Sequence, residues 1–148
     1  MAEAIATGIV ICKDKALVFK DKYDNASLPK FAMQEGEDAI DAFCIGIRRA
    51  TGITRNQLMF VKEMGCSTVS QANKEQKTYC LLWKTFLFEL PQSYKGQRMD
   101  WVEIRQLRRV LTDSYEKNFC KIRASEIYNA KYDMKHTPPR YPQEGVRW

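Results

Sequence analysis

Three acidic side chains, Glu35, Glu37 and Asp41, crowd one short segment of the sequence. Glu37 and Asp41 are four residues apart, so on a helix they would share a face and offer carboxylate oxygens to a divalent cation. Acids at the start of a helix also interact favourably with the helix dipole and with water. We favour the second interpretation and expect no cofactor, with Mg²⁺ or Mn²⁺ present only if these acids bind it.

Other familiar catalytic motifs are missing. The sequence has no glycine-rich phosphate loop and no GxSxG nucleophile elbow. The single histidine, His136, lies in a proline-rich stretch without a cysteine or carboxylate at ligand spacing, which argues against a zinc site or a Cys-His pair. The five cysteines are scattered without a CxxC pair, and they predict reduced core residues of an intracellular protein.

The composition is that of one globular domain. The chain has 148 residues, of which 45% are hydrophobic and 28% charged. Its apolar runs fall well short of the ~18 residues that a membrane span needs, so we expect no membrane association and a cytoplasmic location. The net charge is +6, and residues 105–148 carry ten basic and five acidic side chains. Such an excess marks either a polyanion-binding face or a solvated helix face.

Hydrophobic periodicity predicts an α+β fold. Apolar residues recur with helical spacing from Glu37 to Thr51, and Gly52 fits the end of that helix. The segment 77–90 is apolar on both faces and predicts a central strand. The other predicted elements are strands over 5–12, 16–20, 58–64 and 99–104, polar loops over 22–29 and 65–75, and a last helix over 114–131, within a domain 1–134 that is followed by a proline-containing tail, 135–148.

The segment 28–53 resembles a Nudix box in length, loop-helix-loop layout and hydrophobic positions. The family pattern is G-x5-E-x7-R-E-U-x-E-E-x-G-U, where U is a bulky aliphatic residue. Leu28-Pro29-Lys30 and the later Glu35-Gly36-Glu37-Asp38 also resemble the diadenosine tetraphosphate hydrolases and the mRNA-decapping branch of this family. The resemblance covers residues 5–130 and implies a Nudix-like α/β/α sandwich with a mixed β-sheet. The matching positions of the box are Glu37, Ile47, Gly52 and Ile53.

The positions that carry the family's chemistry differ in this chain. In family members, glutamates of the box helix bind Mg²⁺ or Mn²⁺, which neutralises a polyphosphate and activates water. The corresponding residues here are Gly46, Arg49 and Ala50, and none of them offers an oxygen ligand. Phe31 stands in place of the first glycine and Ile45 in place of the arginine. The resemblance therefore predicts a fold without a metal site and without catalytic residues.

The function that we favour is a catalytically inactive module that binds RNA or a nucleotide, or associates with a ribonucleoprotein. Lys30 matches a lysine that lies near the phosphates in the resembling family, and arginine holds phosphate through paired hydrogen bonds. Tyr79 and Trp83 could stack on bases, although alternate positions of a central strand are more often core. The candidate phosphate- or nucleotide-binding residues are Lys30, Arg48, Arg49, Lys77, Lys84 and Tyr79.

Two further functions stay open. The chain could be a protein-interaction subunit that uses the fold as a scaffold and docks through the 135–148 tail or the basic last helix. It could also be an active nucleoside-polyphosphate hydrolase whose metal site is built from the residual acids. Phe31 should partly fill a substrate pocket, which favours a protein partner, whereas the basic last third favours RNA or a ribonucleoprotein.

Overall fold

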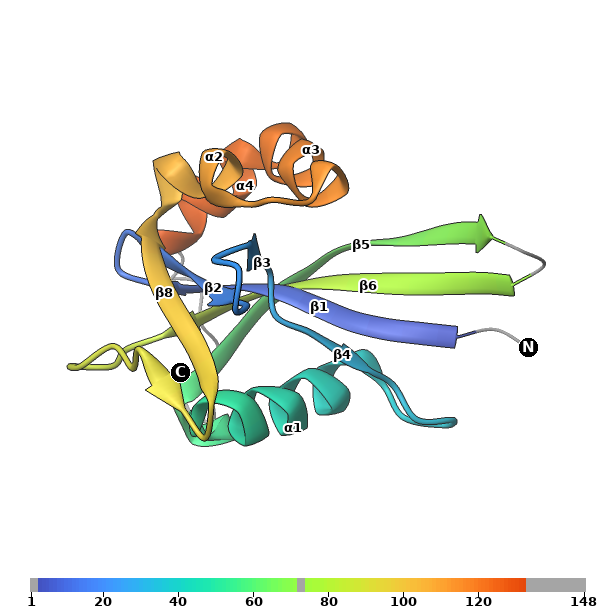
Figure 1. Cartoon of the computed structure of the whole chain (residues 1–148), viewed down its shortest axis with the longest axis horizontal. Helices are drawn as coiled ribbons and strands as arrows, with labels where there is room; N and C mark the ends of the chain where they lie inside the picture. Colours follow the sequence, from blue (N-terminus) through green and yellow to red (C-terminus); the bar gives the residue numbers. More distant parts are fainter. Residues whose placement is uncertain (1–2, 72–73, 133–148) are drawn as a thin grey trace, which may run out of the picture.

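The computed structural model describes residues 3–71 and 74–132, so the tail predicted over 135–148 lies outside the described residues. A mixed β-sheet has α1 on one face and α2, α3 and α4 on the other, which confirms the predicted α/β/α sandwich (Figure 1). The strands are β1 (Glu3–Cys12), β2 (Lys15–Lys20), β3 (Ala26–Ser27), β4 (Lys30–Ala32), β5 (Leu58–Gln71), β6 (Lys74–Thr85), β7 (Ser93–Tyr94) and β8 (Gln97–Glu103). The helices are α1 (Ala39–Thr51), η1 (Arg55–Gln57), η2 (Ile104–Gln106), α2 (Leu107–Val110), α3 (Ser114–Ile122) and α4 (Ala124–Asn129).

Strand β1 lies at the centre of the sheet, whose order is β5-β6-β1-β2-β8-β7. It runs parallel to β6, with Ala6 opposite Tyr79, and antiparallel to β4, with Thr7 opposite Lys30. Because side chains alternate along a strand, Ala6 and Tyr79 face α1, whereas Thr7 and Lys30 face the layer of α2–α4. The sequence correctly predicted that β6 is central, although the strand ends at Thr85 and not at position 90.

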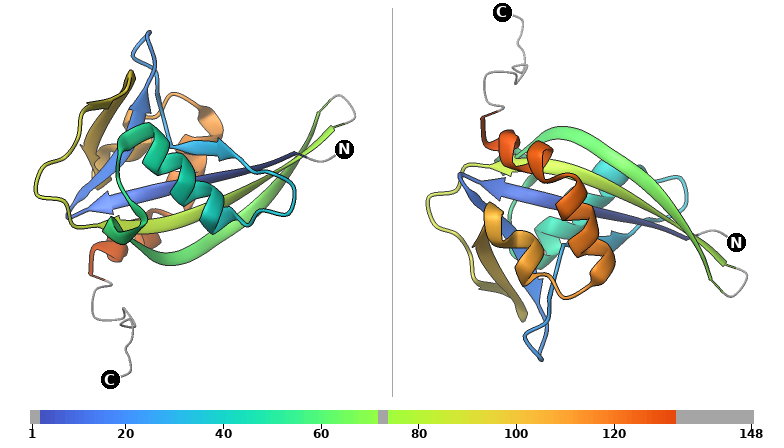
Figure 2. Two further views of the ribbon diagram at one scale, coloured as in Figure 1. Left: turned by 90° about the horizontal axis from the view of Figure 1, so that it is seen from below. Right: turned by 90° about the horizontal axis from the view of Figure 1, so that it is seen from above.

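Two cores lie on the two faces of the sheet. Under α1, the rings of Phe43 and Trp83 pack with Leu81, and all three side chains are buried. Under α2–α4, Leu82 of the same strand packs with Leu107 and with residues of the last helices. Figure 2 shows α1 crossing one face of the sheet and the group of short helices covering the other. Strand β6 therefore contributes to both cores, as its two-sided hydrophobicity predicts.

The composition of segment 65–75 predicted a polar loop, but its described residues belong to strands β5 and β6. Strand β5 continues to Gln71 and pairs with β6 from Gly65 to Gln71, with Cys66 opposite Tyr79 and Ser67 opposite Thr78. The prediction failed because polar residues are tolerated in a strand that has solvent on its faces, and backbone pairing alone extends the hairpin. Cys66 is exposed, so the prediction that every cysteine is a core residue is wrong at this position.

The C-terminal helix predicted over 114–131 is two helices with a break at Arg123. No glycine or proline marks the break, which is why helical periodicity continued through it. Tyr115 and Ile122 are 77% and 70% exposed, while Glu116 and Cys120 of α3 are buried. In the part of the chain that the structure describes, no helix has the length and apolarity needed to cross a membrane.

Candidate functional site

Helix α1 begins at Ala39, two residues later than predicted. Asp38 is its N-cap, and the Asp38 carboxylate accepts a hydrogen bond of 2.8 Å from the Asp41 backbone N–H. Gly52 ends the helix in the left-handed conformation, at φ 81°, and its N–H donates to the Arg48 carbonyl, as predicted. Glu37 therefore precedes the helix and does not form a helical i, i+4 pair with Asp41.

The residual acids have local structural roles. The Glu37 Oε1 atom accepts a hydrogen bond of 2.9 Å from the Gln34 N–H, and the Asp41 carboxylate pairs with Arg55 at 2.7 Å. This pairing raises the pKa of the Arg55 guanidinium. Glu35 is exposed. Within residues 3–71 and 74–132, no three His, Cys, Asp or Glu side chains come together in a metal-binding group.

Gly46 lies beneath the ring of Phe31. It is buried on the sheet side of α1, and a Cβ atom added to Gly46 would overlap the Phe31 ring. The two residues are fifteen positions apart in the sequence, yet they occupy one volume. A longer side chain at position 46 therefore needs the space that the Phe31 ring fills.

Phe31 belongs to a row of aromatic rings. Its ring centroid lies 5.5 Å from that of Phe43 and 6.2 Å from that of Phe19, both in edge-to-face geometry. Phe43 stacks on Trp83 at 5.4 Å, with an interplanar angle of 11°. These contacts hold Phe31 in place over Gly46. Trp83 is accordingly a core residue and does not present its ring to a base.

The remaining positions of the box helix do not form a cation site. Ile45, Arg48 and Arg49 are exposed, and Ala50 is partly buried. A divalent cation requires several oxygen ligands, whereas the ligand-type positions hold a glycine under a phenyl ring, a guanidinium and a methyl group. The residues present thus do not fit Mg²⁺ or Mn²⁺ at the position where the resemblance would place the metal.

The six predicted phosphate- or nucleotide-binding residues do not lie in one site. Lys77 is exposed and Tyr79 half-buried on the α1 face of β6, and Arg48 and Arg49 lie at the C-terminal end of α1. Lys84 faces the opposite side of the sheet, is 2% exposed, and donates a hydrogen bond of 2.8 Å to the Lys131 carbonyl. The prediction that these cations share a cleft with Lys30 is therefore wrong. Alternation places Lys77 on the other face of the sheet, whereas Lys84 is on the same face as Lys30 but is buried against Lys131 and does not line the cleft.

A cleft of about 550 Å³ opens between the sheet and α3, and we call it the sheet–α3 cleft. Its floor comes from β1, β5 and β6, and its wall from α3. Lys30 is the one predicted binding residue that lines it. Other lining side chains include Ser67, Gln76, Thr78, Asp113, Tyr115, Asn118, Phe119 and Arg123.

Glu116 joins α3 to the strand that carries Lys30. Its carboxylate accepts a hydrogen bond of 3.1 Å from the Leu28 N–H and forms an ion pair with the Lys30 ammonium. The Glu116 side chain is 10% exposed and that of Lys30 44% exposed. Sequence reasoning missed Glu116. One signal was available in the sequence. Glu116 precedes Phe119 by three residues and Cys120 by four, so on a helix it lies on the side that carries the buried Cys120.

Comparison with solved structures identifies the architecture. The chain superimposes on the C. elegans Ap4A hydrolase, as a binary complex, with a TM-score of 0.69 and 15% identity, covering 84% of this chain and 97% of that one. The chain has a Nudix fold. A NUDIX-family hydrolase from Clostridium perfringens matches with a TM-score of 0.64 and 12% identity, over 86% of this chain and 96% of that one.

A further solved structure shows the same fold. A MutT structure from work on Aliivibrio salmonicida and Vibrio cholerae matches with a TM-score of 0.60 and 14% identity, over 85% of this chain and 99% of that one. No family description and no curated protein matches the sequence. The Nudix fold is thus shown by structure, and the activity of this chain has to be argued from its own residues.

Proposed function

We propose that this Nudix-fold chain binds a nucleoside phosphate, as a free nucleotide or at the end of an RNA, in the sheet–α3 cleft and does not hydrolyse it. The absence of hydrolysis is supported by the Phe31 ring over Gly46, because the ring fills the volume that a metal-binding side chain at position 46 would need. Arg49 supports the same conclusion. A positive charge about 4 Å from a divalent ion is opposed by roughly 8 kcal/mol at an effective dielectric of about 20.

The size and lining of the sheet–α3 cleft support a nucleoside ligand. Its volume of about 550 Å³ is within the usual range of small-molecule sites. The amides of Gln76 and Asn118 offer both donors and acceptors to a base edge. Tyr115, exposed at the edge of the cleft, offers a ring on which a base can stack.

Charge limits the expected affinity of this site. Lys30 and Arg123 are the cations that line the cleft, and they are already paired with Glu116 and Glu126, respectively. A phosphate must therefore compete with the Glu116 carboxylate for the ammonium group. We expect binding that is salt-sensitive and weak to moderate, in contrast to a site built from unpaired arginines. One solved neighbour is named an Ap4A hydrolase, which makes Ap4A a sensible first ligand to test.

A protein-binding role has separate support from the loop that follows β6. Phe88 is fully exposed and Phe86 is 55% exposed, and exposed aromatic residues of this kind occur at interaction surfaces. This second function leaves the sheet–α3 cleft without a ligand, so the experiment below distinguishes the two. An active hydrolase with a non-standard metal site has no comparable support, since Glu37 and Asp41 are already bonded to Gln34 and Arg55.

The test is a titration of the full chain with ATP, Ap4A and a short single-stranded RNA in the presence of EDTA, by isothermal calorimetry. We expect saturable binding without metal. Lys30→Gln should weaken it by about tenfold, as for the loss of one charge-assisted contact. Lys77→Gln is the matched control, because Lys77 is an exposed lysine of the same sheet on the opposite face, and it should leave affinity within about twofold.

Two results would contradict the proposal. Absence of binding to all three ligands at low salt would remove the nucleotide function and leave the protein-binding one. Equal weakening by Lys30→Gln and Lys77→Gln would show that the ligand responds to overall charge and does not enter the cleft.

A further inference from the structure

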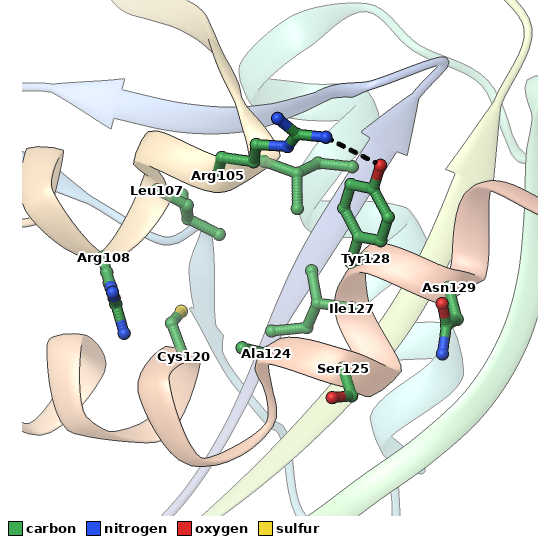
Figure 3. Close-up of a pocket in the computed structure, with 10 residues that line it drawn as sticks. Arg105, Leu107, Arg108, Cys120, Ala124, Ser125, Ile127, Tyr128 and Asn129 are labelled. Atoms are coloured by element: carbon green, nitrogen blue, oxygen red, sulfur yellow. Dashed lines mark hydrogen bonds between the residues drawn. The ribbon is translucent and has the colours of Figure 1, made fainter.

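A second cavity, of about 480 Å³, lies within the layer of short helices, between η2 and α2 on one side and α4 on the other. We call it the α2–α4 cavity. Leu107, Cys120 and Ile127 are buried and give it an apolar floor. Figure 3 shows these side chains converging on the opening from three different helices.

Polar and cationic side chains surround this floor. Arg105 of η2 and Arg108 of α2 line the cavity and are exposed. The Arg105 side chain is directed toward Tyr128, and that of Arg108 lies on the side of Cys120 (Figure 3). Because both side chains are exposed, they are free to turn toward one bound anion. Ser125 and Asn129 of α4 supply a hydroxyl and an amide on the other side. The cavity thus combines an apolar floor with two guanidinium groups at its edge.

Among the described residues, the positive charge beside the cavity has no acid in ion-pair contact, although Glu103 interacts with Arg105 without forming an ion pair. Arg105 and Lys131 donate hydrogen bonds of 3.2 and 3.0 Å to the Tyr128 hydroxyl, and the Lys131 ammonium lies 4.1 Å from the Tyr128 ring centroid. Figure 3 shows the hydrogen bond between Arg105 and Tyr128. Across the described part of the chain, no carboxylate forms an ion pair with Arg105, Arg108 or Lys131.

The two cations change the chemistry of the tyrosine. Their hydrogen bonds favour the phenolate and lower the pKa of Tyr128 to about 8. The groups that face this hydroxyl or its ring are Arg105, Lys131 and Tyr132, and Glu103 acts on Arg105 from the preceding strand. The cluster therefore stabilises negative charge on an oxygen atom, which is the property that an anion site requires.

We propose that the α2–α4 cavity binds a small phosphate monoester, with its phosphate held by Arg105 and Arg108 and its apolar organic part against Leu107 and Ile127. Arginine suits this role because its planar fork donates two parallel hydrogen bonds to phosphate. The site is separate from the sheet–α3 cleft, since Cys120 of α3 faces the cavity while Glu116 and Phe119 line the cleft. It requires no nucleotide in the cleft.

The test uses phenyl phosphate and inorganic phosphate as probes, followed by ¹H–¹⁵N NMR of the full chain. We expect saturable shifts of the amides of 104–108 and 124–129. Phenyl phosphate should bind at least about tenfold more tightly than inorganic phosphate, because its ring buries apolar surface on the floor.

Arg108→Gln should weaken phenyl phosphate binding by about tenfold. Arg109→Gln is the matched control, because Arg109 is an exposed arginine of the same helix that does not line the cavity, and it should leave affinity unchanged. A bound phosphate dianion should also disfavour the nearby phenolate and move the Tyr128 titration, followed by ultraviolet difference absorbance and absent in Tyr128→Phe, to higher pH.

Three results would overturn the proposal. The first is no saturable shift with either probe, and the second is equal weakening by Arg108→Gln and Arg109→Gln. The third is a set of shifts confined to the sheet–α3 cleft, around Gln76 and Asn118, which would place the probe in the other site.

Discussion

At the scale of single residues, the Phe31 ring and the missing side chain of Gly46 form one packing unit. The ring covers the glycine and is held by Phe19 and Phe43. Glycine costs a helix interior about 1 kcal/mol relative to alanine, and here this cost permits the close contact with the ring. The sequence showed both substitutions relative to the Nudix pattern, but their contact became visible only in three dimensions.

This packing predicts opposite effects of one substitution in two backgrounds. Gly46→Ala should lower the free energy of unfolding by about 1–3 kcal/mol, because the added methyl group overpacks the site. In a Phe31→Ala background, the same substitution should raise it by up to about 1 kcal/mol, since only helix propensity remains. Urea denaturation of the four proteins measures both effects. The same sign in both backgrounds would contradict the packing that we describe.

A second residue-scale prediction concerns the Lys30–Glu116 pair. Glu116→Leu should destabilise the fold by about 1–3 kcal/mol, because it leaves the Leu28 N–H without its acceptor in a buried region. Lys30→Met should cost less than about 1 kcal/mol, since the ammonium is half exposed. Thermal unfolding followed by circular dichroism compares the two variants. A larger loss for Lys30→Met would show that the ion pair, and not the backbone hydrogen bond, is the main contribution of Glu116.

At the scale of elements, Asp38 caps α1. The sequence predicted that the acids here either favour the helix dipole or bind a metal. In the structure, Asp38 bonds the Asp41 N–H of the first turn, whereas Glu37 bonds the Gln34 N–H before the helix. Asp38→Ala should lower the free energy of unfolding by about 1 kcal/mol, while Asp38→Asn should keep most of it, because asparagine also accepts the capping hydrogen bond. Chemical denaturation at neutral pH tests this. An equal loss in both variants would show that charge, rather than the cap, is what matters.

The exposure of Cys66 on the β5–β6 hairpin predicts which cysteine reacts with an alkylating reagent. Cys66 is exposed on β5, whereas the other four cysteines are buried, and burial raises the pKa of Cys80 and Cys120 to about 12. Iodoacetamide at pH 8 should therefore alkylate Cys66 alone in the native protein and all five sites after unfolding. Peptide mass spectrometry reads the sites, and Cys66→Ser should abolish native labelling. Rapid labelling of Cys80 or Cys120 would contradict the burial of the two-sided core.

At the scale of the whole molecule, the Nudix resemblance predicted the α/β/α sandwich, and the two-sided hydrophobicity of β6 predicted its central position. Both predictions were possible because box spacing and hydrophobic periodicity are local signals in the sequence. Helix α1 and its glycine cap were predicted for the same reason. The prediction that the cations share one cleft was wrong, because strand alternation places Lys77 and Lys84 on opposite faces of the sheet. Only the register of β6 against β1 shows which face each lysine occupies. Glu116 was missed because its partners, Leu28 and Lys30, are more than eighty residues away in the sequence.

The decisive measurement for the whole account is ³¹P NMR of Ap4A incubated with the full chain and Mg²⁺ or Mn²⁺. The account predicts that the phosphorus resonances of Ap4A broaden or shift on binding while no nucleotide product accumulates. Metal-dependent release of nucleotide that is abolished by Glu37→Gln would contradict it, because this result would restore the residual acids as an active metal site.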